Sequence, residues 1–160
     1  MLRPPDEEDS RWGALRIRGL LILFVAIPVV PYGRDHSNPL VRAEPTWDST
    51  LTRDLAVRAC FDCHSNETKW PWYSNIAPLS WKIKDHVDNG RNKLNFSEWD
   101  RPQEDASESA ESVEKREMPT SDYTLLHPEA RLSSSERAAL ICGLEATFGR
   151  ESEGEEHEDD

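Results

Sequence analysis

Residues 60–64 read Cys60-Phe61-Asp62-Cys63-His64, which is a C-x-x-C-H pattern. This pattern is the attachment signature of a c-type haem. Two thiols about one helical turn apart can each form a thioether with one vinyl group of a single porphyrin, and the adjoining histidine is then held beneath the iron as an axial ligand. The motif therefore predicts one covalent haem c, anchored by Cys60 and Cys63, with His64 on the iron.

Two other uses of the same residues remain open on the sequence alone. A zinc site would need Cys60, Cys63, His64 and a fourth ligand such as Cys142, but the sequence has no second C-x-x-C and no H-x-x-x-H. A disulfide or a thioredoxin-like dithiol is disfavoured because no βαβ pattern surrounds the motif. If haem uses two cysteines, Cys142 is left over, and its apolar helical surroundings predict a buried, inert thiol.

The composition points to one small domain with appendages, because the chain has 160 residues, of which only 36% are hydrophobic and 31% are charged. The formal net charge of -12 argues against nucleic acid and against anionic membrane surfaces as partners. It suits docking to a redox partner protein that carries a basic docking patch.

The N-terminal region predicts export. Arg16 and Arg18 precede an unbroken apolar run over residues 20–31, and residues 14–33 are long enough to span a membrane if the arginines reach the interface. We expect an uncleaved signal anchor, because no A-x-A-like cleavage site follows, with a cleaved signal peptide as the alternative. Either reading places the rest of the chain on the periplasmic, extracytoplasmic side. We divide the chain into an anchor or transmembrane segment (1–33), an extended linker (34–47), a haem-binding domain (48–149) and an acidic, disordered tail (150–160).

Helical periodicity in residues 48–149 predicts an all-α domain. Asp48 or Ser49 can cap a helix that runs to about residue 61 and delivers the motif to the haem. Its expected apolar stripe recurs every fourth residue. The stripe consists of Leu51, Leu55 and Ala59.

The last helix has the clearest start signal, a capping box made by Ser133 and Glu136. Leu140, Leu144 and Phe148 share one face of this helix, and we expect that face to pack across the first helix and close the haem cleft.

Two helices are expected between these. One opens at Pro78 and runs to about residue 89, where Gly90 should stop it. A weaker helix is expected over residues 106–117, before Pro119.

The sixth iron ligand has two candidates. Met118 is the only methionine besides the initiator and lies in a loop next to Pro119, which favours a ligand over a gap-filling core methionine. His86 falls on the apolar face of a predicted helix, where it is either a hydrogen-bonded core residue or the second axial ligand.

An aromatic loop follows the haem motif. Trp70, Trp72 and Tyr73 lie in a segment without helical periodicity. They either line the edge of the haem or pack the loop itself, and the sequence does not separate the two.

Four stretches together resemble the haem-binding domain family related to cytochrome c, which occurs in bacterial exported proteins. They read VPYGRDHSNP (30–39), RACFDCHSNETKWPWYSNIAPLSW (58–81), GRNKLNFSEW (90–99) and EMPTSDYTLLHPEARLS (117–133). The resemblance covers roughly residues 30–149 and implies a small, mainly helical, cytochrome c-like domain with one haem at the outer face of the inner membrane.

The resemblance also implies roles for particular residues. Cys60 and Cys63 would carry the thioethers, and His64 would bind the iron on the proximal side. Met118 matches the position of a distal ligand. Pro78 resembles the proline of cytochromes c whose carbonyl accepts the proximal histidine N–H. The residues around 103–112 depart most from the family pattern.

These features predict an electron carrier that is not an enzyme, a membrane-tethered domain that transfers one electron at a time. Two axial ligands favour this, because a closed iron changes redox state with little rearrangement. The alternative is a haem-based sensor or a peroxidase-like enzyme with an open or weakly held sixth position. His86 or His127 would then supply the distal acid–base group.

Overall fold

Helices make up all the regular structure in the computed structural model, which describes residues 6–150. The predicted acidic tail lies outside the described residues except for Arg150. No strand forms between residues 6 and 150, where an isolated parallel bridge joins Ala43 and Glu98. The all-α prediction is confirmed. The α-helices are α1 (Asp6–Ala26), α2 (Thr50–Ala59), α3 (Phe61–His64), α4 (Leu79–Lys93), α5 (Ser109–Glu114), α6 (Ser121–Leu126) and α7 (Ser134–Phe148), and short 3-10 helices cover Ile27–Val29, Trp72–Asn75, Glu104–Ala106 and Pro128–Ala130.

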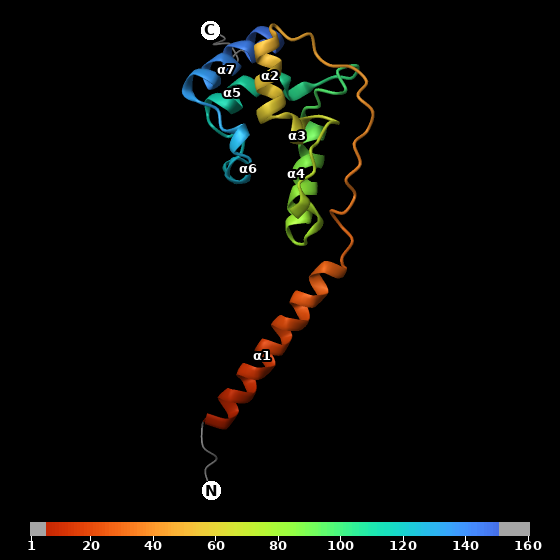
Figure 1. Ribbon diagram of the computed structural model, residues 1–160, viewed down its shortest axis with the longest axis vertical. Helices are drawn as coiled ribbons and strands as arrows, with labels where there is room; N and C mark the ends of the chain where they lie inside the picture. Colours follow the sequence, from red (N-terminus) through yellow and green to blue (C-terminus); the bar gives the residue numbers. More distant parts are fainter. Residues whose placement is uncertain (1–5, 151–160) are drawn as a thin grey trace, which may run out of the picture. The chain divides into compact units, whose positions relative to one another are not determined.

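The described chain separates into two compact units. The first combines residues 6–36 with residues 71–85, and the second combines residues 37–70 with residues 86–150. In the first unit, α1 is long and apolar enough to cross a membrane, with a mean hydropathy of 1.7 over Trp12–Val29. Helix α1 is one continuous helix (Figure 1), and its large apolar side chains from Trp12 to Val25 are exposed.

In the second unit, α2 begins where the sequence indicates. The Ser49 side chain accepts a hydrogen bond from the Thr52 backbone N–H at 3.2 Å and caps the helix. The buried face, however, is rotated from the predicted stripe. Leu51 is 56% exposed, whereas Leu55 and Ala59 are buried as expected, together with Thr52 and Ala56. Helical periodicity alone could not choose between neighbouring faces, because Thr52 and Ala56 are too small to mark one.

The capping box predicted for α7 is present, with Ser133 and Glu136 bonded to each other's backbone N–H groups. Helix α7 packs against both α2 and α5 (Figure 1) and buries Leu140 and Leu144. Gly143 allows the close approach of α2, because a methyl group there would collide with the Thr52 side chain. The predicted packing of the first domain helix against the last is therefore present.

Aromatic rings fill the space beside α2 and α7. Phe96 lies at the centre, with ring centroids 5.2 Å from Trp47, 5.4 Å from Phe61 and 6.1 Å from Phe148. Trp47 belongs to the stretch expected as a linker, residues 34–47. From Ser37 onward this stretch is extended but packs on the second unit, where the Arg42 backbone N–H also donates to the Ser97 carbonyl at 2.8 Å.

Two helix ends differ from the prediction. Helix α4 continues through Gly90 to Lys93, so Gly90 does not stop it. The glycine instead allows contact with the haem motif, since a methyl group at Gly90 would collide with the Cys63 carbonyl. Helix α5 is shorter than the expected 106–117, beginning at Ser109 after a separate 3-10 turn.

Candidate functional site

Two adjoining cavities in the second unit surround the C-x-x-C-H motif. Their volumes are about 230 Å³ and 340 Å³, and the larger lies within the range of about 300–1,000 Å³ typical of cofactor sites. Both are lined by Ala59, Cys60, His64, Lys93 and Met118. The predicted proximal and distal iron ligands therefore line the same space, although 54 residues separate them in the sequence.

Each cavity has apolar side chains along part of its wall. Leu94, Phe96, Val113 and Leu144 line the smaller cavity, and Cys63, His86, Pro119 and Tyr123 line the larger. Lys93 is the one lysine or arginine among the lining residues of the two cavities.

The short helix α3 presents the two cysteines. The His64 backbone N–H donates to the Cys60 carbonyl at 2.9 Å, which closes one helical turn and sets the spacing of the thiols. Burial raises the pKa of Cys60 to about 12 and that of Cys63 to about 11. A redox dithiol needs a thiolate of lowered pKa, so these thiols do not suit that function.

His64 is oriented for metal binding. Its Nδ1–H donates to the Leu94 carbonyl oxygen at 3.1 Å, so Nε2 is the nitrogen available to an iron. Burial lowers the pKa of His64, which favours the neutral imidazole that a metal requires. The expected role of Pro78 is wrong, because Leu94 supplies this carbonyl. The Pro78 carbonyl accepts the Trp81 backbone N–H at 3.1 Å, within the first turn of α4.

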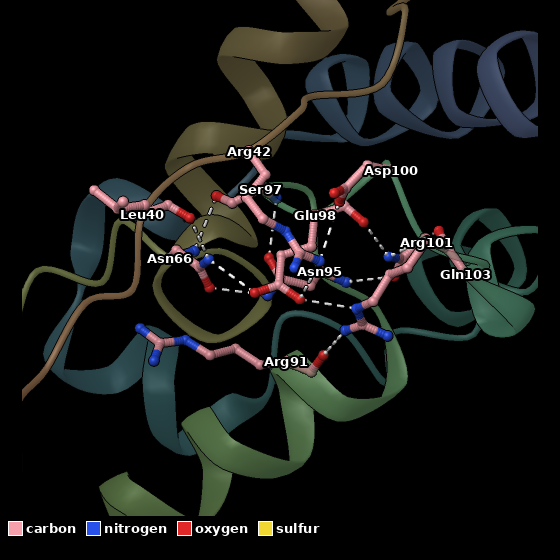
Figure 2. A network of polar contacts seen from close by, with 10 residues as sticks. All are labelled: Leu40, Arg42, Asn66, Arg91, Asn95, Ser97, Glu98, Asp100, Arg101 and Gln103. Carbon is pink, nitrogen blue, oxygen red and sulfur yellow. Dashed lines mark hydrogen bonds and ion pairs between the residues drawn. The ribbon is translucent and has the colours of Figure 1, made fainter.

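Hydrogen bonds fix the segment that follows α4 and carries the Leu94 carbonyl, and Figure 2 shows Asn66, Asn95 and Ser97 in this network. The Phe96 backbone N–H donates to the His64 carbonyl at 2.8 Å. The buried Asn95 side chain donates to Asn66 Oδ1 at 2.9 Å, and the Asn66 backbone N–H donates to Ser97 Oγ at 2.9 Å. The resemblance includes this stretch, but the sequence does not indicate these bonds, because hydrogen-bonded loops leave no periodic signal.

Met118 reaches both cavities from the segment between α5 and α6. Its backbone N–H donates to the Ser112 carbonyl at 3.1 Å, and its side chain is partly accessible, since the residue is 37% exposed. His86 lines only the larger cavity. Both residues predicted as sixth-ligand candidates thus line the site, Met118 in both cavities and His86 in the larger one.

Tyr123 is a site residue that the sequence did not single out. Its hydroxyl donates to Asp62 Oδ2 at 2.7 Å, which ties α6 to the haem motif. Burial, reinforced by the bond to Asp62, raises the pKa of Tyr123 well above its usual range. Its ring stacks on His127 with centroids 4.2 Å apart. An aromatic residue 60 positions from the motif gives no sequence signal of this contact.

The aromatic candidates of the loop after the motif make contacts of their own. Trp70 is absent from the lining of both cavities and instead donates its indole N–H to Asn38 Oδ1 at 3.2 Å, so it packs the loop. Trp72 and Tyr73 belong to the first unit, where their rings meet edge to face at 5.8 Å and Trp72 is 77% exposed.

The structure corrects the prediction for Cys142 and weighs against zinc. Cys142 is exposed on α7, not buried. Within residues 6–150, no three His, Cys, Asp or Glu side chains come together to hold a metal ion. A zinc site built on Cys60, Cys63 and His64 therefore has no support.

The fold and the site define a helical domain with a cavity suited to haem. Residues 22–146 match the haem-binding domain family, so the chain belongs to that family. Comparisons with curated proteins and with solved structures gave no match. Family membership makes haem the cofactor of this domain, and the partly apolar cavity walls, the lowered pKa of His64 and the two thiols all fit it.

Proposed function

We propose that this domain carries one haem c and transfers single electrons. Cys60 and Cys63 would hold the haem covalently, while His64 and Met118 would bind the iron. The observation that carries the proposal is that His64 and Met118 line the same two cavities, next to the two thiols. When bound, the haem iron supplies a one-electron redox couple.

The chain's own residues would keep the iron site unchanged between its two redox states. His64 is fixed by its bond to the Leu94 carbonyl, so the imidazole does not need to turn when the charge changes. The Met118 thioether would close the opposite side. Leu94, Phe96, Val113 and Leu144 would give the haem an apolar wall in the smaller cavity.

The larger setting of the domain is part of the same proposal. Helix α1 would anchor the chain in the membrane, with the haem domain on the periplasmic side. A redox partner with a basic patch would complement the net charge of -12. Carboxylates of Asp105, Glu108 and Glu117 line the smaller cavity, so negative charge lies next to the proposed haem.

One observation favours a second function. Met118 is 37% exposed, and His86 lines the larger cavity beside it. If Met118 leaves the iron readily, an open sixth position next to His86 would suit a haem-based sensor or a peroxidase-like enzyme. We rank this second, because it needs an open coordination position, and Met118, the proposed sixth ligand, lines both cavities.

A reduced-minus-oxidised visible spectrum of the purified protein separates these functions. The proposed carrier should give the spectrum of low-spin, six-coordinate iron in both redox states, without binding added carbon monoxide readily. A high-spin, five-coordinate spectrum would reject the electron carrier in favour of the sensor or peroxidase. A protein without any haem spectrum would reject both.

A further inference from the structure

One peptide group links the proximal histidine to a distant side chain. The carbonyl of the Leu94–Asn95 peptide accepts the His64 Nδ1–H at 3.1 Å. The N–H of the same peptide donates to Gln103 Oε1 at 2.8 Å. A hydrogen bond at one end of a peptide polarises the group and strengthens the bond at its other end, by roughly 10–30%. Gln103 therefore acts on His64 through this peptide.

Gln103 is itself held in position (Figure 2). Its Nε2 donates to the Glu98 carbonyl at 2.9 Å. The Glu98 side chain accepts bonds from Arg101 at 2.8 Å and from Asn66 at 3.1 Å. Arg101 also donates to the Arg91 carbonyl at 2.9 Å, which connects the group to the last turn of α4.

The Asn95 backbone N–H donates to Gln103 and is buried, so water cannot replace Gln103 as its acceptor. Asn95 is only 2% exposed, so loss of the Gln103 acceptor would leave a buried N–H without a partner. The bond is therefore built into the site and is not an incidental surface contact.

We propose that Gln103 is a positioning residue for His64, which sets the orientation and the electron-donating strength of the imidazole through the Leu94–Asn95 peptide. This inference rests on the proposed haem site. A stronger acceptor at Nδ1–H makes the imidazole a better donor to iron, and a better donor favours the ferric state. Gln103 should thus hold the reduction potential lower than the axial ligands alone would set it.

The test is a redox titration of the full-length haem protein carrying Gln103→Met. Methionine is similar in size and neutral, so a change in the potential cannot come from added charge. We expect the ratio of ferrous to ferric protein at a fixed solution potential to rise by a factor of roughly two. The low-spin spectrum should be kept. Ser133→Ala is the control, because it removes the cap of α7 and lowers stability without touching the Leu94–Asn95 peptide.

The possible outcomes are distinct. A raised potential in Gln103→Met, with an unchanged potential in Ser133→Ala, supports the inference. An unchanged potential in Gln103→Met together with a lowered melting temperature overturns it, because Gln103 would then only stabilise the loop. If Gln103→Met does not accumulate, the same titration is done on Gln103→Asn, whose shorter side chain draws the oxygen away from Asn95. The same two results then support or overturn the inference. A wild-type protein without haem would overturn the proposed function itself.

Discussion

At the scale of single residues, the motif predicts the chemistry and the structure adds the groups that control it. The C-x-x-C-H spacing and the lone Met118 identified residues that the fold brings to one pair of cavities. The partners of those residues could not be predicted. Leu94 and Tyr123 bond to the motif from 30 and 61 positions away, and Gln103 bonds to Asn95 and not to the motif itself; Leu94 contributes only a carbonyl, which every residue has.

The sixth ligand is tested by Met118→Ala. A thioether raises the reduction potential and an imidazole lowers it, so loss of Met118 should lower the potential. The weak near-infrared-edge absorption of the ferric protein, which reports sulfur ligation, should disappear. His86→Ala is the matched control and should leave both unchanged. If His86→Ala alters the spectrum while Met118→Ala does not, the ligand is His86.

At the scale of elements, α2 and α7 pack against each other, and both contribute residues to the lining of the smaller cavity. Sequence patterns predicted both helices because their caps are local, with Ser49 and Ser133 each bonded within its own first turn. They missed the continuation of α4 past Gly90. A glycine commonly ends a helix. Gly90 instead lies inside α4, where the absence of a side chain leaves room for the Cys63 backbone, and these two residues are 27 positions apart.

The contribution of α7 to the core is tested by Leu144→Ala. Leu144 is 1% exposed and lies in the main hydrophobic cluster, so the change should lower the free energy of unfolding by about 2–5 kcal/mol. Denaturant unfolding measures this quantity. Leu125→Ala, at a residue that is 70% exposed, should change it by less than about 0.5 kcal/mol. Equal effects of the two substitutions would mean that α7 is not part of the core.

A pH dependence is expected where α2 meets α7. Arg58 Nη1 donates to Glu136 Oε1 at 2.7 Å, and this bond, together with the hydrogen bonds of Ser133, lowers the pKa of Glu136 from 4.5 to about 2. A lowered pKa in the folded state stabilises the fold above pH 4.5, and that stabilisation is lost as the pH falls toward 2.

Melting temperatures between pH 2 and pH 7 test this for wild type and Glu136→Gln. The variant should be less stable than wild type at pH 7, and the difference should shrink as the pH falls. Asp54→Asn, which neutralises an exposed carboxylate on α2, is the control and should show a smaller change. A difference between wild type and Glu136→Gln that does not vary with pH would contradict the expectation.

At the scale of the whole molecule, the sequence predicts two separate parts, an apolar N-terminal segment for the membrane and a domain that binds haem. Helix α1 has the length and hydropathy to span a membrane, which the sequence could predict because that property is one of composition. The grouping of residues 71–85 with the N-terminal residues was not predicted. It depends on packing between segments that the sequence pattern does not link.

Export and anchoring are tested by N-terminal sequencing of the protein from the membrane fraction. We expect the N-terminus to be intact, because no cleavage site follows the apolar run. A mature N-terminus between residues 33 and 44 would reject anchoring and leave export in place.

The central claim is that Cys60 and Cys63 bind the haem covalently. The direct measurement is the mass of the denatured chain, purified from a host that has haem-ligation machinery. We predict that the wild-type chain keeps the mass of one haem after denaturation and stains for haem peroxidase activity on a denaturing gel. Cys63→Ala should lose most of this signal, and Cys142→Ala should retain it. A denatured wild-type chain with the mass of the polypeptide alone would contradict the claim.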